Sequence, residues 1–340
     1  MSQILIIYTG GTIGMMSDPN TKVLKPINFD QIMDNVPELE KLNCKLKIHS
    51  FHEIIDSSNM NPAIWSELAG LIESNYDSVD GFVILHGSDT MAFTASALSF
   101  MLENLNKPII FTGSQLPISA VRTDAKENLM TSIEIAKAKK NELARVPEVC
   151  IYFDYKLFRG NRSFKYNSSK FEAFRSPNYP ILAESGVHLR FSQNDIRHPK
   201  ENSQLIVHKN LVNDVAVLKL YPGIGPKVVE AILKADVRGI IMETFGAGNT
   251  TTDQWFIDMI KDAINSGKVI LDISQCKVGT VELGRYDTSR QLKEIGVANG
   301  YDMTYESAVT KMMFLLGQNK DPQVVKNLLE IDLRGEITVS

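Results

Sequence analysis

Three separate stretches of the chain carry hydroxyl, carboxylate and amine side chains that together could break an amide or acyl bond. They are Tyr8-Thr9-Gly10-Gly11-Thr12-Ile13-Gly14, His86-Gly87-Ser88-Asp89-Thr90 and Arg159-Gly160-Asn161-Arg162-Ser163-Phe164-Lys165. A hydroxyl is a weak nucleophile until a base takes its proton, and a lysine can serve when its surroundings lower its pKa. The residues favour a Thr or Ser nucleophile helped by Lys165, although Arg159, Arg162 and Lys165 fit solvated loop charges equally well.

Each hydroxyl-rich stretch follows a segment predicted to be a strand: 4–7, 81–85 and 108–111 are short apolar runs typical of buried strands, and 46–51 alternates enough for a strand. These segments, 4–7, 46–51, 81–85 and 108–111, are followed, in that order, by Thr9 and Thr12, Ser57 and Ser58, Ser88 and Asp89, and Thr112 and Ser114. Parallel strands bring their carboxyl ends to one edge of a sheet, where ligands bind. Turn and cap chemistry explains any one cluster, but four in succession favour a binding site.

Apolar runs and helical segments alternate along the chain, which predicts a largely parallel sheet with crossover helices. We expect helices over 62–73, 91–103 and 124–140, a strand over 149–153, and a loop over 15–27. The fold class is α/β, with a larger N-terminal catalytic domain (1–191), a linker (192–213) and a smaller C-terminal α/β domain (214–340). Helix 91–103 is apolar on more than one side, which suggests burial on both sides and hints at a subunit interface.

Composition excludes several classes of function. The 340 residues contain 36 Lys and Arg against 40 Asp and Glu, a net charge of -4, so we expect no nucleic acid or membrane partner. The three cysteines lie far apart and the six histidines form no metal-binding pair, so we predict no metal. The first apolar run has no basic segment before it and no apolar stretch could span a bilayer, so we expect a cytoplasmic protein.

The glycine turn at 10–14 does not match the common phosphate-binding loops. It lacks the Lys-Ser/Thr ending of a P-loop, and its G-G-x-x-G spacing differs from the G-x-G-x-x-G dinucleotide fingerprint. The chain also lacks the G-x-S-x-G elbow of serine hydrolases. Nucleotide binding and elbow-type serine hydrolysis are therefore not favoured.

The three stretches resemble the signature sequences of bacterial L-asparaginases, in particular the cytoplasmic type I branch. The resemblance covers essentially the whole chain. It continues through Asp56-Ser57-Ser58-Asn59-Met60, Ala95-Ser96-Ala97-Leu98-Ser99-Phe100-Met101-Leu102, Thr112-Gly113-Ser114-Gln115, Tyr221-Pro222-Gly223 and Leu333-Arg334-Gly335-Glu336. It implies hydrolysis of L-asparagine to aspartate and ammonia, with no cofactor, by a homodimer or homotetramer.

The resemblance also implies roles for individual residues. Thr12 would attack the side-chain amide carbon to form an acyl-enzyme, while Ser88, Asp89 and Lys165 would form a second catalytic group. The remaining implied contacts are with substrate. Asp56, Ser57 and Ser58 would hold the α-carboxylate, Asp89 would accept from the α-ammonium, and backbone amides near Gly11, Ser88 and Ser114 would form the oxyanion hole.

The chain departs from the family pattern at several positions. Ser88 replaces the usual Thr, which keeps the hydroxyl. Many relatives have a lid tyrosine where this chain has about Val23 and Leu24, so either other groups activate Thr12 or a tyrosine such as Tyr286 takes that place. A second, activating asparagine site in some relatives would match Phe164, Glu243 and Cys276. Phe164 and Glu243 replace the Thr and Arg of a regulated relative, so we expect weak or absent substrate activation.

Two other functions remain open at this point. One is an asparaginase-like subunit that delivers ammonia for a tRNA-linked amidotransferase; such subunits normally carry an extra N-terminal region, whereas this chain begins at its first strand. The other is a non-catalytic amino-acid-binding protein on the same scaffold, against which the presence of Lys165 argues.

Overall fold

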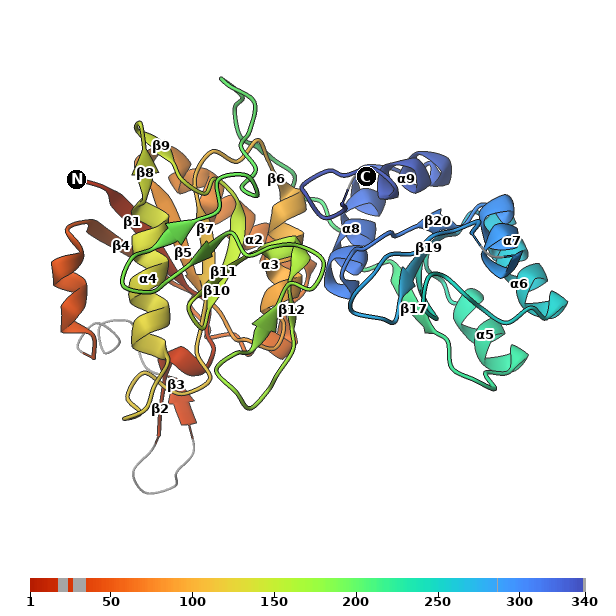
Figure 1. Ribbon diagram of the computed structural model, residues 1–340, viewed down its shortest axis with the longest axis horizontal. Helices are drawn as coiled ribbons and strands as arrows, with labels where there is room; N and C mark the ends of the chain where they lie inside the picture. The colour runs from red at the N-terminus through yellow and green to blue at the C-terminus, as the bar shows by residue number, and fades with distance from the viewer. Residues whose placement is uncertain (18–23, 27–34, 286, 339–340) are drawn as a thin grey trace. The chain divides into compact units, whose positions relative to one another are not determined.

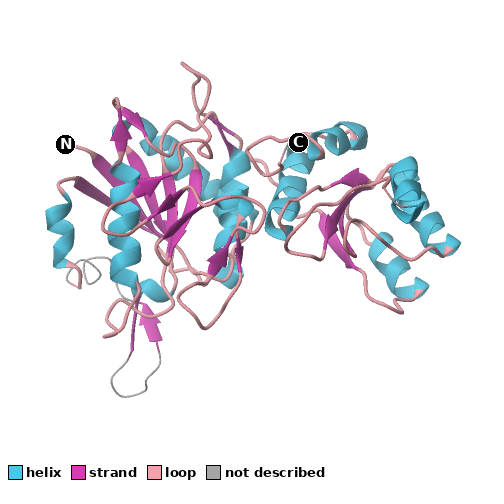
Figure 2. Ribbon diagram, in the orientation of Figure 1, coloured by secondary structure: helices cyan, strands magenta, loops and turns pink. Residues whose placement is uncertain are grey.

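An eight-stranded sheet organises the first part of the chain (Figure 2). Its strand order is β15-β14-β11-β10-β7-β5-β1-β4, and the five strands from β10 to β4 are parallel, as the sequence predicts. The other three pair antiparallel at one side. The bounds are β1 Gln3–Tyr8, β4 Lys45–Ser50, β5 Gly81–Leu85, β7 Ile109–Thr112, β10 Val149–Phe153, β11 Lys156–Arg159, β14 Ala183–Glu184 and β15 Arg190–Phe191.

The computed structural model describes residues 1–17, 24–26, 35–285 and 287–338 (Figure 1). The chain divides into two units, one of residues 1–176 with 180–209 and one of residues 177–179 with 210–340. The main boundary, between Lys209 and Asn210, falls within the segment 192–213 that the sequence suggests as a linker, and residues 192–209 pack with the first unit.

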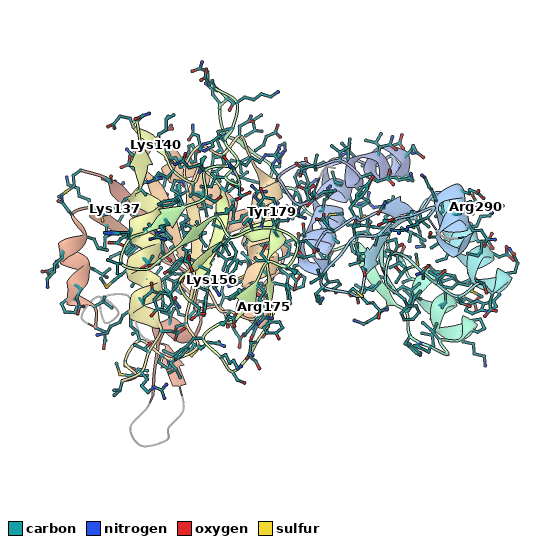
Figure 3. All side chains as sticks on the ribbon, in the orientation of Figure 1. Lys137, Lys140, Lys156, Arg175, Tyr179 and Arg290 are labelled. Atoms are coloured by element: carbon teal, nitrogen blue, oxygen red, sulfur yellow. The ribbon has the colours of Figure 1, made fainter. Side chains whose placement is uncertain are left out.

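The central strands of the first unit are buried along their length because helices and loops cover them. Every residue of β5, β7 and β10 is buried, which accounts for their apolar sequences apart from Thr112 at the end of β7. Helix α2 (Pro62–Asn75) begins where expected, since the Asn61 side chain accepts from the amides of Ala63 and Ile64. Helix α4 (Ala125–Lys137) lies across the sheet and ends with Lys137 donating to the carbonyl of Leu42 (Figures 1 and 3).

Helix α3 (Met91–Met101) is buried on all sides, as its sequence predicts, but within its own unit. Only Phe93 is partly exposed. The helix packs against α2, β10 and the 3-10 helix η5 (Gly160–Arg162). Its apolar surface therefore needs no second subunit to cover it, and the argument for an interface at α3 is wrong; a homodimer or homotetramer rests on family resemblance alone.

Two segments differ from the sequence-based expectation. The helix expected to reach residue 140 stops at Lys137, and β8 (Lys139–Lys140) and β9 (Leu143–Ala144) form a hairpin instead. Asn141 and Glu142, at φ 52° and 65°, make the turn, which a helix cannot contain. The expected loop at 15–27 includes an antiparallel pair, β2 (Met15–Ser17) with β3 (Leu24–Pro26).

Short pairs complete the first unit: β6 Leu102–Glu103 with β16 Ile206–Val207, and β12 Phe164–Lys165 with β13 Phe174–Arg175. Two further 3-10 helices are η2 Pro37–Leu42 and η4 Tyr76–Ser78. Among the described residues, every helix is too short or too polar to cross a bilayer.

The second unit is a four-stranded parallel sheet between two layers of helices (Figure 1). Helices α5, α6 and α7 pack side by side on one face, and α8 and α9 contact the sheet from the other. The bounds are β17 Val215–Lys219, β18 Gly239–Thr244, β19 Val269–Ser274, β20 Ala298–Asn299, α5 Pro226–Leu233, α6 Gln254–Asn265, α7 Asp287–Ile295, α8 Tyr305–Gln318 and α9 Pro322–Leu329.

A buried ion pair fastens the C-terminal segment to α8. Lys311 Nζ lies 2.6 Å from Glu336 Oε1, and both side chains have zero exposure. The same ammonium donates to the carbonyls of Leu329 and Ile331 at 2.9 and 2.6 Å. Burial lowers the pKa of Lys311 and Glu336 opposes that shift. Removing one partner would leave a buried charge without its counterion.

We expect Lys311→Met to lower the free energy of unfolding of the second unit by roughly 3–5 kcal/mol, because Glu336 would stay buried without its cation. The control is Lys234→Met, which removes an exposed pair with Glu230 on α5 and should leave the midpoint of urea denaturation unchanged. Equal midpoints for both variants and wild type would show that the buried pair does not stabilise the unit.

A buried carboxyl in β19 makes stability depend on pH. Asp272 is fully buried, Thr244 Oγ1 donates to its Oδ1 at 2.7 Å, and no donor among the described residues contacts Oδ2. Burial raises the pKa of Asp272 from 3.8 to about 7. The folded state therefore keeps a proton that the unfolded state has lost, so this group's contribution to stability falls as the pH rises from about 4 to about 7.

Replacing Asp272 with Asn should remove this dependence, since the amide cannot ionise. Thermal midpoints measured for wild type and Asp272→Asn from pH 5 to pH 8 should diverge, with the wild type losing stability relative to the variant up to about pH 7 and the difference levelling off above it. Parallel curves for the two proteins would contradict the assignment.

Candidate active site

The glycine turn after β1 packs against the turn after β5. The amide and Oγ1 of Thr9 both donate to the carbonyl of Leu85, at 3.0 and 2.9 Å. Gly11 has φ 95°, and a Cβ there would lie 2.7 Å from the nitrogen of Gly87. Only glycine fits such a position. This contact places Thr12, the partly exposed first residue of the 3-10 helix η1 (Thr12–Gly14), beside the stretch that carries Ser88.

Tyr8 stabilises the glycine turn through a buried hydrogen bond. The sequence did not reveal this role. The Tyr8 side chain is fully buried, and its hydroxyl donates to the carbonyl of Gly14 at 2.9 Å. Burial raises the pKa of Tyr8 to about 12, so the phenol keeps its proton. A Cβ on Gly14 would overlap this hydroxyl, which explains the third glycine of the turn.

Lys165 reaches Ser88 and Asp89. Its Nζ donates to Ser88 Oγ at 2.9 Å and also pairs with Asp89 Oδ1. The Lys165 side chain is 16% exposed and that of Asp89 is 67% exposed, so the group opens to solvent on the carboxylate side. Because Ser88 Oγ accepts from the ammonium, the hydroxyl hydrogen of Ser88 can point to another acceptor.

The chain reaches Lys165 by first running back along the sheet. Strand β11 runs antiparallel to β10 and returns the chain to the amino edge of the sheet. Helix η5 then packs on α3, where a Cβ on Gly160 would lie 2.9 Å from Ala95 Cβ. From there β12, which also contacts α3, carries Lys165 back to the residues just before that helix.

The two arginines of the same stretch are structural and not solvated. Arg159 Nε lies 2.6 Å from Glu148 Oε2 in a buried ion pair, and Arg162 is 1% exposed. Of the three basic residues that the sequence left equivalent, Lys165 is the one that contacts Ser88 and Asp89.

Ser57 also packs against the turn after β5. A Cβ on Gly87 would lie 2.6 Å from Ser57 Oγ, and Thr90 Oγ1 donates to the Ser57 carbonyl at 2.6 Å. Asp56 accepts from the amide of Ser58 at 2.9 Å and thereby caps the 3-10 helix η3 (Ser57–Asn59). Ser57 is buried, whereas Asp56 and Ser58 are exposed.

The hydroxyl groups at the end of β7 donate hydrogen bonds to backbone carbonyls. Thr112 Oγ1 donates to the carbonyl of Tyr152 at 2.9 Å, and Ser114 Oγ donates to that of Leu116 at 2.6 Å. A Cβ on Gly113 would lie 2.5 Å from the carbonyl oxygen of His86, so this turn does approach the one after β5. The strand ends gather as predicted, but the side chains of Thr9, Thr112 and Ser114 stabilise turns.

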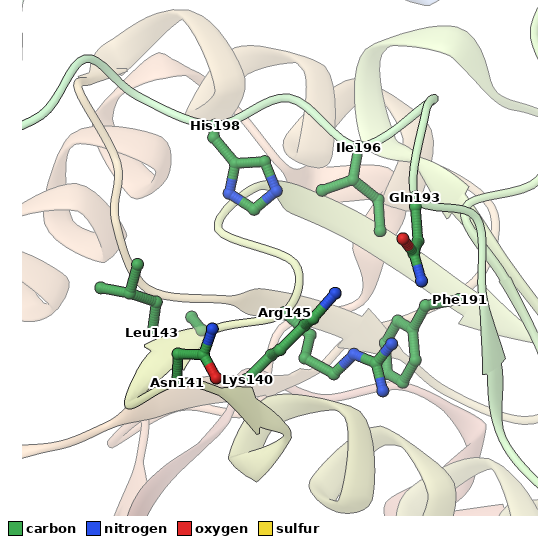
Figure 4. A pocket seen from close by; sticks show the side chains of 9 residues that line it. Lys140, Asn141, Leu143, Arg145, Phe191, Gln193, Ile196 and His198 are labelled. Atoms are coloured by element: carbon green, nitrogen blue, oxygen red, sulfur yellow. The ribbon is translucent and has the colours of Figure 1, made fainter.

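A cavity of about 270 Å³ lies elsewhere in the first unit (Figure 4). Its lining includes Lys140, Phe191, His198 and Arg145, whose guanidinium lies 4.4 Å from the Phe191 ring centre. The β8–β9 hairpin that lines it leads into the start of β10, so it lies at the sheet edge opposite Thr12 and Ser88. We therefore do not assign this cavity to the candidate active site.

Several sequence-based expectations stay predictions. Val23 and Tyr286 lie outside the described residues. Phe164 is buried in β12, while Glu243 in β18 is buried and pairs with Lys219 at 3.2 Å, and Cys276 is exposed. Within the described residues no group of three or more His, Cys, Asp or Glu side chains could hold a metal.

Comparison with known proteins identifies both units. Residues 3–197 match the family model for the asparaginase N-terminal domain, and residues 214–329 match that for the glutaminase/asparaginase C-terminal domain. The chain is 39% identical over 338 residues to L-asparaginase 1 of Escherichia coli, covering 98% of each chain.

Two further relatives show the breadth of the similarity. The chain is 37% identical to the 60 kDa lysophospholipase of Mus musculus, covering 99% of this chain and 63% of that longer protein. The crystal structure of L-asparaginase I from Vibrio cholerae superposes with a TM-score of 0.90 at 38% identity, covering 99% of both chains. With matching domains along nearly its whole length, the chain belongs to the asparaginase family.

Proposed function

We propose that this chain hydrolyses L-asparagine to L-aspartate and ammonia, with Thr12 as the nucleophile. The observation that carries the proposal is the contact of Lys165 with both Ser88 and Asp89, next to the turn that presents Thr12. The Lys165 side chain is only 16% exposed, and its ammonium contacts both a hydroxyl and a carboxylate, an arrangement suited to orienting a catalytic hydroxyl. Family membership and the name of the E. coli relative support the same activity.

The first half of the reaction forms an acyl-enzyme. The Thr12 oxygen attacks the side-chain amide carbon of asparagine, and the Thr12 proton is passed on toward the leaving nitrogen. Backbone amides near Gly11, Ser88 and Ser114 donate to the oxyanion that develops. When the tetrahedral intermediate collapses, the C–N bond breaks, ammonia leaves, and an aspartyl ester of Thr12 remains.

The second half returns the enzyme to its starting state. Water attacks the ester carbon, Ser88 and Lys165 take part in moving its proton, and the Thr12 oxygen leaves and is reprotonated. Lys165 contributes by orienting Ser88, since its ammonium donates to Ser88 Oγ and pairs with Asp89. Charge-assisted hydrogen bonds of this kind are about twice as strong as neutral ones, so the group is held in place before substrate arrives.

The amino-acid end of the substrate would bind beside this group. We assign its α-carboxylate to the loop Asp56-Ser57-Ser58, where Ser57 packs on Gly87 and Ser58 is exposed. Asp89, 67% exposed, is available to accept from the α-ammonium. A carboxylate that can accept from an ammonium, together with serine hydroxyls that can donate to a carboxylate, fits an amino acid better than a simple amide.

The two rival functions have less support. An ammonia-delivering amidotransferase subunit would share the chemistry, but the E. coli relative that matches 98% of both chains bears the name L-asparaginase 1. A non-catalytic amino-acid-binding protein would have no need for Lys165 at Ser88.

Ammonia release from asparagine should depend on Thr12 and Lys165. Thr12→Ala, which removes the nucleophile, should lower kcat by at least about a thousandfold, and Lys165→Met by about a hundredfold or more, because the partners of Ser88 and Asp89 are lost. The controls are Thr12→Ser, which keeps a hydroxyl, and Lys170→Met, which changes an exposed lysine nearby.

The same assay separates the alternatives. Wild type that binds asparagine but releases no ammonia would favour the binding protein, and a strong preference for glutamine would favour the amidotransferase subunit. Undiminished turnover by Thr12→Ala would remove Thr12 as nucleophile.

Initial rates should rise hyperbolically with asparagine concentration. At the positions that match the activating site of a regulated relative, Phe164 is buried and Glu243 is already paired with Lys219. A buried carboxylate at Glu243 would also repel the substrate's α-carboxylate. Steady-state rates fitted over a wide range of asparagine concentrations test this, and clear sigmoidal dependence would contradict it.

A further inference from the structure

His86, one residue before the Gly87-Ser88 peptide, lies in a fully buried hydrogen-bonded chain. Its Nδ1 lies 2.7 Å from the carbonyl oxygen of Gly87, and its Nε2 lies 2.9 Å from Thr94 Oγ1. Thr94 Oγ1 in turn accepts from the indole of Trp65 at 3.0 Å. His86 and Thr94 have zero exposure and Trp65 is 5% exposed. This series of hydrogen bonds thus links α2, α3 and the turn after β5.

Each hydrogen in this hydrogen-bonded network of Trp65, Thr94, His86 and Gly87 has one possible position. The indole nitrogen only donates and a carbonyl oxygen only accepts. Thr94 Oγ1 therefore accepts from Trp65 and gives its own hydrogen to Nε2 of neutral His86, while Nδ1 carries the hydrogen that goes to Gly87. Burial lowers the pKa of His86 to about 4, so the ring stays neutral near pH 7.

The orientation of the Gly87 carbonyl decides where the next amide points. In the described residues all peptide bonds are trans, and a trans peptide holds its C=O and N–H on opposite sides. With the carbonyl of Gly87 turned toward the buried imidazole, the N–H of Ser88 points away from it. A rotated Gly87-Ser88 peptide would instead turn a carbonyl oxygen toward the substrate.

We propose that His86, fixed as its Nδ1–H tautomer by Thr94 and Trp65, is a positioning residue that aims the Ser88 amide at the substrate. The inference rests on the proposed hydrolysis, in which that amide belongs to the oxyanion hole. His86 itself touches no substrate and exchanges no proton. The imidazole ring, 5.7 Å from Phe111 between ring centres, is held against rotation by the same core that buries it.

The test compares variants that keep or remove the donor at the Nδ1 position. His86→Phe keeps a ring in the core but has no donor, so we expect kcat to fall roughly tenfold to a hundredfold with a much smaller change in KM. His86→Asn places an amide N–H near the position of Nδ1 and should recover most of the lost kcat. A purely structural histidine would show no such difference between Phe and Asn at equal folded content, measured by circular dichroism.

Thr94→Val removes the hydroxyl that fixes the tautomer and keeps the shape of the side chain. We expect it to lower kcat severalfold, whereas the matched control Thr131→Val, which removes a hydroxyl bound to Glu127 on α4, should not. Imidazole ¹⁵N NMR of wild type adds a measurement that needs no variant. It should show Nδ1 protonated, Nε2 unprotonated, and no titration of His86 above about pH 5.

The outcomes separate this inference from the proposed function. If wild type releases no ammonia from asparagine, the proposed function fails, and the NMR signal alone decides the tautomer. If wild type is active and His86→Phe has the kcat of wild type, or if Nε2 carries the hydrogen, the positioning role of His86 is wrong while the hydrolase proposal stands.

Discussion

The candidate site depends on how closely two backbone turns approach each other. Gly11 and Gly87 pack with no room for a side chain between them, since a Cβ on Gly11 would sit 2.7 Å from the Gly87 nitrogen. Because Gly11 also has φ 95°, an L-residue there would be both strained and obstructed. This contact brings together the turns that follow two neighbouring parallel strands, β1 and β5. Thr12 lies on the first turn and Ser88 on the second.

Hydrogen bonds and an ion pair hold these two turns in place. Tyr8 holds the turn that presents Thr12, and Lys165 holds Ser88 and Asp89. Both hydrogen-bond donors are anchored before any ligand binds. Catalysis benefits from such preorganisation because no reorganisation has to accompany the developing charge. On the core side of the turn after β5, the hydrogen bonds from Gly87 through His86 and Thr94 to Trp65 extend into the core between α2 and α3.

Much of this arrangement could be predicted from the sequence because local signals and the fold agree. The apolar runs at 81–85 and 149–153 became β5 and β10 with the same bounds, since strands buried on both faces have no polar positions. Asn61 and Pro62 marked the start of α2 for a local reason, the capping of free amides.

The remainder depends on contacts between distant residues, which local patterns do not encode. The return of β11 to the amino edge and the packing of η5 on α3 fix Lys165, while its neighbours Arg159 and Arg162 turn into the core. The hairpin at 139–144 required positive φ at Asn141 and Glu142, and Glu is an uncommon choice there. The link from Trp65 through Thr94 to His86 joins residues up to 29 positions apart, so spacing could not reveal it.

The central claim is that the hydroxyl of Thr12, and not that of Ser88, forms the covalent bond to substrate. Its most direct test is rapid acid quenching of the enzyme during turnover of asparagine, followed by proteolysis and mass spectrometry of the peptides. The account predicts an aspartyl ester on the peptide that contains Thr12, which disappears when asparagine is exhausted. An ester found on the Ser88 peptide, with Thr12 unmodified, would contradict it.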